Sequence, residues 1–411
     1  MLSADLKFTQ GIHGFQVISR KRRKRRKSEE ISEIHIRRAS FQCPFCDSHD
    51  VSAYPQNERV VRAVPIGRTA CLLHVTVHKL YCPDCGRTSY ERLGFLPSPK
   101  SRMTRQLERT LLELRPHMSI KALSEHFGVP WQAIKDAEKA ALGRKYARVS
   151  LKDVRALGID EIYVFRTAKS HEKYITVVRD LDTGAVLEVS RGKGADALKA
   201  FSKRIRRHRK RIKFVCMDMS NAYAAWVKDA LPDVAIVYDH FHVVKSMNDK
   251  LDQIRRKAMR SMDEQTRKAI KRKRFLFLKN HDKLDEDEAD ALEKARSMHQ
   301  PLSDAYMLKE ELRGIYANAG SEEAARHLFE RWCRLADDTG LPEMRSMAKQ
   351  VREHIKGILG YWTFAGASNA STEGFNNKIR WLISQAYGFH DYEYFRLKVF
   401  DLPSTNIKKC L

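Results

Sequence analysis

RALGIDEIYVF at 155–165, KYITVVRDL at 173–181 and AVLEVS at 185–190 decide the fold of the larger part of this chain. Each run is short, apolar and rich in β-branched or aromatic residues. Turn-forming residues, such as those at 182–184, separate the runs. This pattern predicts three strands joined as a meander.

Beyond the meander, helical and strand patterns alternate. Residues 195–207 indicate a helix, KFVCMD at 213–218 a short buried strand, 220–231 a helix, and VAIVYD at 234–239 another strand. From residue 246 to 360 only helical patterns remain, in a long charged stretch. We therefore expect a multidomain α/β protein whose mixed sheet is flanked by helices and followed by a large all-helical insertion.

The charge balance restricts the partners. In 411 residues, 77 Lys and Arg face 51 Asp and Glu, which gives a formal net charge of +26. A surplus of this size concentrates polyanions, of which nucleic acid is the commonest and an anionic membrane the rival. No apolar run approaches the roughly 20 residues of a spanning helix, and the N-terminus lacks a secretory pattern. We expect a soluble cytoplasmic protein that binds DNA and has no membrane partner.

Four of the eight cysteines form two CxxC pairs, Cys43 with Cys46 and Cys82 with Cys85. Each pair sets two thiolates on one tight turn, so the four predict a zinc ribbon holding one structural Zn²⁺ with no open position for substrate. Two unrelated reduced cysteine pairs are the alternative. Other candidates nearby are expected to be solvated or packed rather than ligating: His49, His74, His78 and Cys71.

Residues 119–142 contain a helix–turn–helix pattern. Ser119 is a candidate cap for the first helix, Gly128 ends it, and Pro130 starts the second helix, where no backbone donor is needed. An outward-facing second helix with polar and basic side chains suits a DNA major groove, although an ordinary helical hairpin has the same pattern. The expected contacts are Trp131, Gln132 and Lys135.

A basic run at residues 20–27 most often means a solvated arm, and on DNA it would contact phosphates. Its candidate contacts are Arg22 and Arg23.

Two acids stand out by their position on predicted strands. Asp160 lies within the first strand, and Asp218 ends the buried strand at 213–218. Strand ends at one edge of a sheet are where ligands bind in α/β folds. Glu161 alternates to the opposite face and is the weaker candidate. The alternative is that they are ordinary acids among the 51 Asp and Glu residues of the chain and have no catalytic role.

GIDE at 158–161, VCMDMSNAY at 215–223, YDHFHVVK at 238–245 and SNASTEGFNNKIRWLISQAYGF at 368–389 resemble the insertion-sequence transposases of the ISL3 family. The resemblance covers roughly residues 40–402, and the last block is its most specific part. It implies a ribonuclease-H-like core of the Asp-Asp-Glu type.

Carried over by motif, the resemblance implies catalytic acids at Asp160, Asp218 and Glu373, which would hold two Mg²⁺ (or Mn²⁺) ions. On the Glu373 helix we expect DNA contacts from Asn377, Lys378 and Arg380. Supporting side chains around the metals are expected at Asp239, His240 and His242.

The implied activity is cleavage of double-stranded DNA at the terminal inverted repeats, followed by strand transfer to target DNA by a homo-oligomer. A catalytically silent DNA-binding regulator and a structure-selective nuclease remain as alternatives. The expected domains are a basic extension (1–40), a zinc-binding domain (41–95), a helix–turn–helix domain (100–148), the first part of the core (150–245), a helical insertion (246–360) and the C-terminal core helices (361–411).

Overall fold

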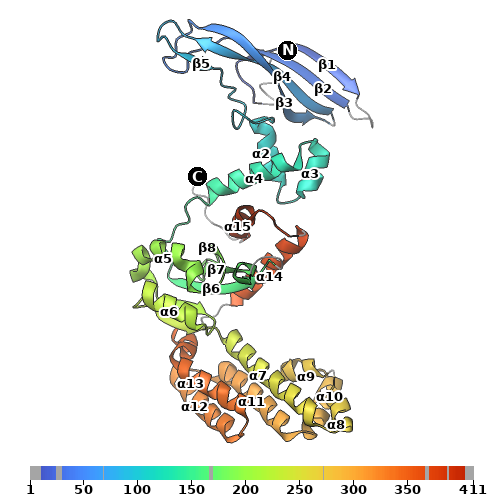
Figure 1. The fold of residues 1–411 in the computed structure, drawn as a ribbon, viewed down its shortest axis with the longest axis vertical. Coiled ribbons are helices and arrows are strands. Elements are labelled where there is room, and N and C mark those ends of the chain that lie inside the picture. Colours follow the sequence, from blue (N-terminus) through green and yellow to red (C-terminus); the bar gives the residue numbers. More distant parts are fainter. Residues whose placement is uncertain are drawn as a thin grey trace. The chain divides into compact units, whose positions relative to one another are not determined.

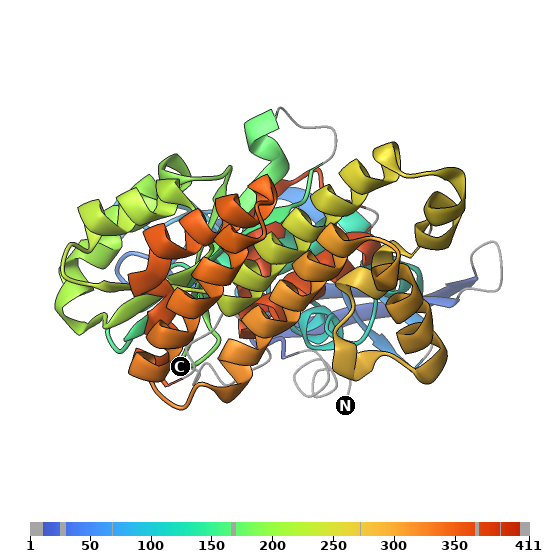
Figure 2. The same cartoon turned by 90° about the horizontal axis from the view of Figure 1, so that it is seen from below.

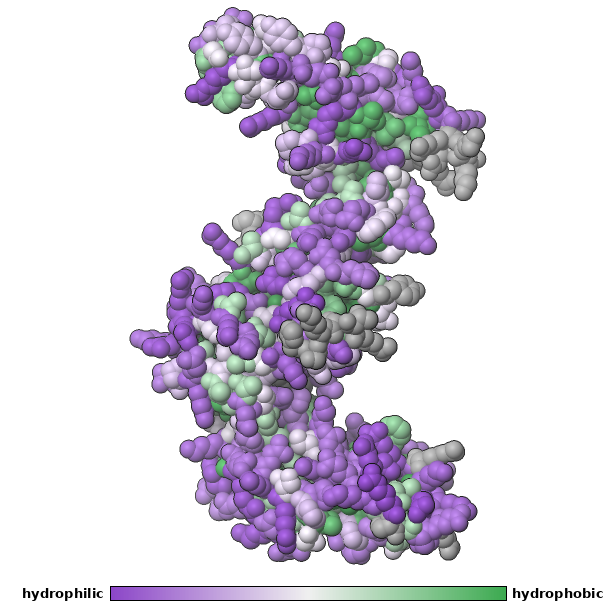
Figure 3. All heavy atoms as spheres, in the orientation of Figure 1, coloured by the Kyte–Doolittle hydropathy of each residue, from purple (hydrophilic) through white to green (hydrophobic). Residues whose placement is uncertain are grey.

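The computed structural model describes residues 11–24, 30–67, 69–165, 170–271, 273–365, 370–386 and 388–402. The chain divides into two compact units, Met1–Lys145 and Tyr146–Leu411. Figure 1 draws the first in blue to teal and the second in green to red. Hydrophilic side chains cover most of the face drawn in Figure 3. Among the described helices, none is both long enough and apolar enough to cross a bilayer.

The first unit joins a sheet to a group of helices. Its strands are ordered β1-β2-β4-β3, with β5 beside β4. β2 and β4 run parallel, whereas β3 and β4 form a long antiparallel hairpin. The elements are β1 (Phe15–Lys24), β2 (Glu30–Arg38), β3 (Ser52–Ile66), β4 (Thr69–Tyr81), β5 (Thr88–Tyr90), α2 (Arg105–Leu114), α3 (Ile120–Phe127) and α4 (Trp131–Lys145).

The expected basic extension at 1–40 is wrong for the part that the structure describes. Phe15–Lys24 and Glu30–Arg38 are strands of the same sheet that carries the cysteine turns, and Arg20–Lys24 form the end of β1 rather than a free arm. Strand β1 is hard to recognise in the sequence because it lies at the edge of the sheet. An edge strand needs only one row of buried side chains and tolerates cations along its open side. Phe15 supplies that burial, while Arg22 and Arg23 stay exposed.

Three helices follow the sheet. The Ser119 hydroxyl caps α3 by accepting a hydrogen bond from the Ala122 amide (3.1 Å). Gly128 ends α3 in the left-handed conformation at φ 60° and ψ 26°. Both roles were predicted from the sequence. Leu123 of α3 and Ile134 of α4 are buried against each other's helices, so the two helices share one apolar core.

The second unit is built on a mixed sheet of order β10-β9-β6-β7-β8. β6, β7 and β8 are antiparallel neighbours, whereas β9 and β10 run parallel to β6. The three-strand meander and the alternating elements after it are thus confirmed as secondary structure. The strands are β6 (Ala156–Tyr163), β7 (Tyr174–Asp180), β8 (Val186–Arg191), β9 (Phe214–Met217) and β10 (Ala235–Tyr238).

Helices surround this sheet and extend beyond it. The α-helices are α5 (Lys199–Ile205), α6 (Asn221–Ala230), α7 (His240–Ser261), α8 (Glu264–Ile270), α9 (Arg274–Leu278), α10 (Glu286–Ser297), α11 (Gln300–Asn318), α12 (Glu322–Asp338), α13 (Pro342–Thr363), α14 (Ala370–Gln385) and α15 (Tyr392–Asp401). Short 3-10 turns are η1 (Ser170–Lys173), η2 (Ala195–Leu198), η3 (Arg206–Arg211) and η4 (His281–Lys283). The expected all-helical stretch corresponds to α7–α13.

The long helices α7, α11, α12 and α13 pack on one another (Figures 1 and 2). α13 also lies directly against β10. Gly357 allows this approach, because a Cβ there would lie 2.4 Å from the Tyr238 ring. Gly360 does the same beside Val237. The helical insertion is therefore anchored to the edge of the sheet next to the strand that precedes Asp218.

Candidate active site

Two acids predicted from the sequence meet at neighbouring parallel strands. Asp160 lies in β6, and Asp218 directly follows β9. Gly158 pairs with Cys216, so extending this register by two residues sets Asp218 beside Asp160. Their charges interact, since Asp160 raises the pKa of Asp218. The sheet therefore brings together two carboxylates that are distant in sequence.

The carboxyl group of Asp218 is partly buried and lies near other charged side chains. Burial is the main cause that raises the pKa of its carboxyl, and the charges of Glu161 and Asp160 raise it further, whereas His242 lowers it. Its Oδ1 is buried and has no hydrogen-bond partner among the described residues. A half-buried carboxylate with an unpaired oxygen beside other acids fits a cation, because a divalent ion supplies the missing charge and the missing ligand.

Asp160 is held by the backbone and by one helix. Its Oδ1 accepts a hydrogen bond from the Glu161 amide (2.8 Å). Its Oδ2 accepts a hydrogen bond from the Asn376 side chain at 2.5 Å, across 216 residues of sequence. Asn376 is itself buried in α14, next to Phe375 and one turn before the buried Ile379. The packing of α14 on the sheet thus orients the Asp160 carboxylate.

Asn376 was not predicted as a site residue. The sequence offered one signal, the pair Asn376-Asn377 in the specific C-terminal block, but only the tertiary contact shows which asparagine faces the sheet. Asn377, Lys378 and Arg380, which were predicted to contact DNA, are exposed on α14. Arg380 donates a hydrogen bond to Asn377 (2.7 Å). These three side chains therefore face solvent and not the acids of the sheet.

Glu373 lies in the first turn of α14 and is exposed. It precedes Asn376 by three residues, so the two are neighbours on the helix surface. In the described part of the chain, however, the three acids are not among the groups whose ligand atoms all lie within 4.8 Å of one another. The structure pairs Asp160 with Asp218 and leaves Glu373 on the adjoining helix, in an open arrangement.

Glu161 belongs to a different network on the opposite face of the sheet. The Tyr223 hydroxyl donates a hydrogen bond to Glu161 Oε1 (2.6 Å), and the Gly194 amide donates another (3.1 Å). Thr176, which is paired with Glu161 across the strands, also contacts the Tyr223 hydroxyl (2.9 Å). Glu161 Oε1 is thus engaged by the Tyr223 hydroxyl and the Gly194 amide, while the Glu161 charge still acts on Asp218.

Asp239, His240 and His242 begin α7 beside the acids. Asp239 caps the helix, and its amide donates a hydrogen bond to the Met217 carbonyl (2.9 Å). His242 lowers the pKa of Asp218, so it lies near that carboxyl. His240 instead packs among the rings of Phe241, Tyr316 and Tyr361. In the described residues, His242 therefore acts on Asp218, whereas His240 lies 3.6 Å from Asp239.

The four cysteines of the first unit come together as predicted. Sγ of Cys43 lies 3.6 Å from that of Cys85, and Sγ of Cys46 lies 3.6 Å from that of Cys82. A tetrahedral zinc with Zn–S bonds of about 2.3 Å needs sulfur atoms roughly 3.8 Å apart. The cluster therefore fits a four-thiolate zinc site. Burial opposes ionisation of Cys43, but hydrogen bonds from the backbone of Phe45 and Cys46 lower the pKa of its thiol to about 7.

The two cysteine turns have matching backbones. The Cys43 amide donates to the Ser48 carbonyl (2.8 Å), and the Cys82 amide donates to the Arg87 carbonyl (3.0 Å). The residue after each second cysteine has a positive φ, 65° at Gly86 and 58° at Asp47. Glycine and aspartate are among the residues that tolerate this conformation. Cys71, in contrast, is buried in the apolar core of the sheet.

The helix after Gly128 presents the predicted side chains outward. Trp131 is 58% exposed, although it is the largest apolar residue of α4. Gln132 is exposed as well and donates a hydrogen bond to Asp136 (2.8 Å). Lys135 is partly exposed on the same helix. The outer face of α4 thus combines an aromatic ring with polar and basic groups.

A second basic surface lies in the second unit and was not predicted. The run KRIRRHRKRIK at 203–213 spans the end of α5 and η3. We call its exposed cations the basic strip: Lys203, Arg206, Arg207, Arg209, Lys210, Arg211 and Lys213. This cluster of Lys and Arg is as dense as the run at 20–27, but part of it was predicted only as the end of the helix at 195–207.

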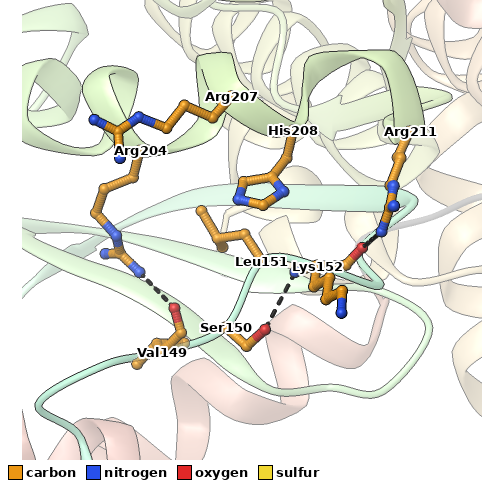
Figure 4. Close-up of a pocket in the computed structure, with 8 residues that line it drawn as sticks. All are labelled: Val149, Ser150, Leu151, Lys152, Arg204, Arg207, His208 and Arg211. Carbon is orange, nitrogen blue, oxygen red and sulfur yellow. Dashed lines mark hydrogen bonds between the residues drawn. The ribbon is translucent and has the colours of Figure 1, made fainter.

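The basic strip borders a cavity of about 610 Å³. Figure 4 shows Arg204, His208 and Arg211 pointing from the helical segment toward residues 149–152. Arg204 is already paired with Glu188 (2.8 Å), whereas Arg207 makes no ion pair within the described residues. The strip precedes β9 and Asp218 follows it, so a strand of four residues, roughly 13 Å long, separates the strip from the acids.

Comparisons with known proteins show the family to which the sequence belongs. The family model described as a transposase, that of the ISL3 group, matches residues 157–399. The transposase for insertion sequence element IS1001 of Bordetella parapertussis is 30% identical, with 87% of each chain covered. The transposase for IS1557 of Mycobacterium tuberculosis is 26% identical over 80% of this chain and 78% of the relative. Since the family match contains Asp160, Asp218 and Glu373 and extends over more than half of the sequence, this chain belongs to the ISL3 family of insertion-sequence transposases.

Proposed function

We propose that the chain binds the ends of its insertion sequence and catalyses DNA cleavage and strand transfer by metal-dependent phosphoryl transfer. The observation that carries this proposal is the pairing of Asp160 with Asp218 on adjacent parallel strands, beside a helix that bears Glu373 and is hydrogen-bonded to Asp160 through Asn376. Carboxylates from two strands and one helix form an oxygen-rich site of the kind that magnesium prefers.

The sheet topology supports a ribonuclease-H-like core. Three antiparallel strands are followed by two strands parallel to the first, in the order β10-β9-β6-β7-β8. In this order β6 is central and β9 is its neighbour, so Asp160 within β6 lies beside Asp218, the first residue after β9. The topology does not set the third acid, which depends on how α14 packs.

Each residue of the site has a defined task in this proposal. Asp160, Asp218 and Glu373 hold two magnesium ions, which when bound activate the attacking oxygen and stabilise the leaving oxygen of the phosphodiester. Asn376 fixes the Asp160 carboxylate, and His242 partly balances the charge at Asp218. Positioning of the DNA strand and charge stabilisation supply most of the rate.

DNA recognition is divided between the two units. In the first, α3 and α4 act as a helix–turn–helix, with Trp131, Gln132 and Lys135 on the face offered to the major groove. The four-cysteine module holds one structural Zn²⁺, and Arg22 and Arg23 on β1 contact phosphates. In the second, Asn377, Lys378 and Arg380 extend from the Glu373 helix toward the DNA strand. Two ends must be joined, so the chain acts as a homo-oligomer.

The test is magnesium-dependent cleavage of duplexes that carry the element's own ends. Asp160→Ala, Asp218→Asn and Glu373→Gln are each expected to lower cleavage by at least about 100-fold, the effect of losing a group that stabilises transition-state charge. End binding should persist in all three. Asp287→Asn is the matched control, because its side chain is exposed in the first turn of α10, within the helical insertion.

The outcomes separate the alternatives. If Asp160→Ala still cleaves DNA, the assignment of Asp160 as a catalytic metal ligand is wrong. End binding without any magnesium-dependent cleavage in the wild-type chain identifies a silent regulator. Cleavage without joined products in a plasmid strand-transfer assay identifies a nuclease with the same core.

A further inference from the structure

A second group of metal-ligating side chains lies on the sheet of the first unit, apart from the four cysteines. It comprises His35 of β2, Glu58 of β3 and His74 of β4, and their ligand atoms all lie within 4.8 Å of one another. His35 and His74 are directly paired across the parallel strands. Glu58 is paired with Thr76, two residues after His74. Since side chains alternate along a strand, the register itself sets all three on one face.

The distances within this group suit a tetrahedral ion. Glu58 Oε1 lies 3.3 Å from His74 Nδ1 and 3.7 Å from His35 Nδ1. The two imidazole rings are stacked, with centroids 4.4 Å apart, and the Nδ1 atom of each lies near the same carboxylate oxygen. Ligands bound to zinc at about 2.0–2.1 Å lie roughly 3.3–3.4 Å from one another.

His74 is the residue that needs an explanation. Its side chain is 15% exposed, its Nε2 has no hydrogen-bond partner among the described residues, and its Nδ1 lies 3.3 Å from Glu58 Oε1 without hydrogen-bond geometry. A buried polar group left without a partner costs about 1–3 kcal/mol. Native proteins keep few such groups, and an ion absent from the coordinates is one of the ordinary reasons for them.

We propose that His35, Glu58 and His74 bind a divalent transition-metal ion of the zinc class, distinct from the ions at the four cysteines and at the catalytic acids. Two imidazoles and one carboxylate suit zinc and its neighbours, whereas magnesium prefers oxygen ligands alone. Glu58 is 54% exposed, so the fourth position opens to solvent and takes water. The ion links β2, β3 and β4 at a single point.

The test counts ions on the full-length protein by cobalt(II) titration in excess magnesium, which keeps the catalytic acids occupied. Cobalt at the cysteines shows a thiolate-to-metal charge-transfer band, and cobalt at the proposed site does not. The wild type is expected to take up one ion of each kind. In His35→Ala and His74→Ala the affinity for the second ion should fall by more than the roughly 10- to 100-fold that losing an outer-shell partner costs.

Two controls keep this result interpretable. His78 lies four residues after His74 on the same face of β4, and its Nδ1 is 3.0 Å from the Glu91 carboxylate. His78→Ala removes this imidazole and should leave binding of the second ion unchanged. Glu58→Gln preserves the shape of the cluster while removing its charge, and should weaken binding even if the histidine variants misfold.

The proposal is overturned if the wild type takes up no ion without thiolate character. It is also overturned if that ion persists unchanged in Glu58→Gln and His74→Ala, or disappears only in Asp218→Asn. In those cases the cluster is an ordinary contact between two histidines and a carboxylate. DNA cleavage by these variants is a separate readout, so this inference and the proposed function fail independently.

Discussion

The four-cysteine site and the acidic site are assembled in opposite ways. Each half of the cysteine site is a turn of a few residues with its own backbone hydrogen bonds, and the sulfur atoms already lie 3.6 Å apart. The acidic site takes its parts from two strands and a helix, and its third acid remains exposed. A structural metal needs a closed shell of protein ligands, whereas a catalytic metal needs room for substrate oxygens. The closed cysteine site thus suits the structural ion proposed for it, and the open acidic site suits the catalytic ions proposed there.

Removing a cysteine should give the largest effect. Cys82→Ser opens the thiol shell, and structural zinc contributes on the order of 10–16 kcal/mol to folding in small zinc domains. The first unit should lose its thermal transition while the second unit keeps its own, as measured by calorimetry with zinc release. Cys71→Ala is the control, because Cys71 is equally buried but lies in the apolar core. Equal losses in both variants would show that packing, not metal, holds this sheet.

Removing the support of Asp160 should have a smaller effect, and one confined to chemistry. Asn376→Ala frees the Asp160 carboxylate, and losing an outer-shell partner typically costs 10- to 100-fold in metal affinity or activity. Cleavage should fall by about that factor, partly restored by higher magnesium, with unchanged end binding. Asn377→Ala, on the exposed side of the same helix, should not raise the magnesium requirement. An identical magnesium response in both variants contradicts the positioning role.

The open acidic site also needs DNA to be brought to it, and the basic strip is the candidate for that task. Arg207→Ala combined with Lys210→Ala should weaken binding to any duplex and lower the salt dependence of affinity by about one unit per lost phosphate contact. Catalysis at saturating DNA should change little, because the strip and the acids flank opposite ends of β9. The measurement is the binding constant as a function of salt concentration, for the wild type and the double variant. If the slope of its logarithm against the logarithm of salt concentration does not change, the basic strip does not contact DNA phosphates.

The smallest expected effect lies within the cysteine turns themselves. Gly86→Ala puts a side chain at φ 65°, which costs roughly 1–2 kcal/mol. Asp47→Gly, at the equivalent position of the other turn, removes a side chain from φ 58° and should be tolerated. Thermal unfolding of the first unit compares the two. If both changes destabilise equally, the turns are not equivalent and Asp47 contributes through its side chain.

Local patterns predicted local features well. Ser119 caps its helix, Gly128 ends it in the left-handed conformation, and the CxxC turns converge, because each depends on a few adjacent residues. The β1 strand was missed because Arg20–Lys24 resemble a free arm unless their partner strand is known. Asn376 was missed because its partner Asp160 lies 216 residues away, although its spacing from the apolar Ile379 already puts it on the buried side of α14.

The sequence by itself determined the family, the cysteine turns and, from residue 155 onward, the order of strands and helices, and it pointed to Asp160 and Asp218. Only the tertiary structure decided that Asp160 is held by Asn376, and that His35, Glu58 and His74 share one face. The reason is physical. Periodicity reports which side of an element is buried, whereas the partner on that side is chosen by packing between segments as much as 216 residues apart.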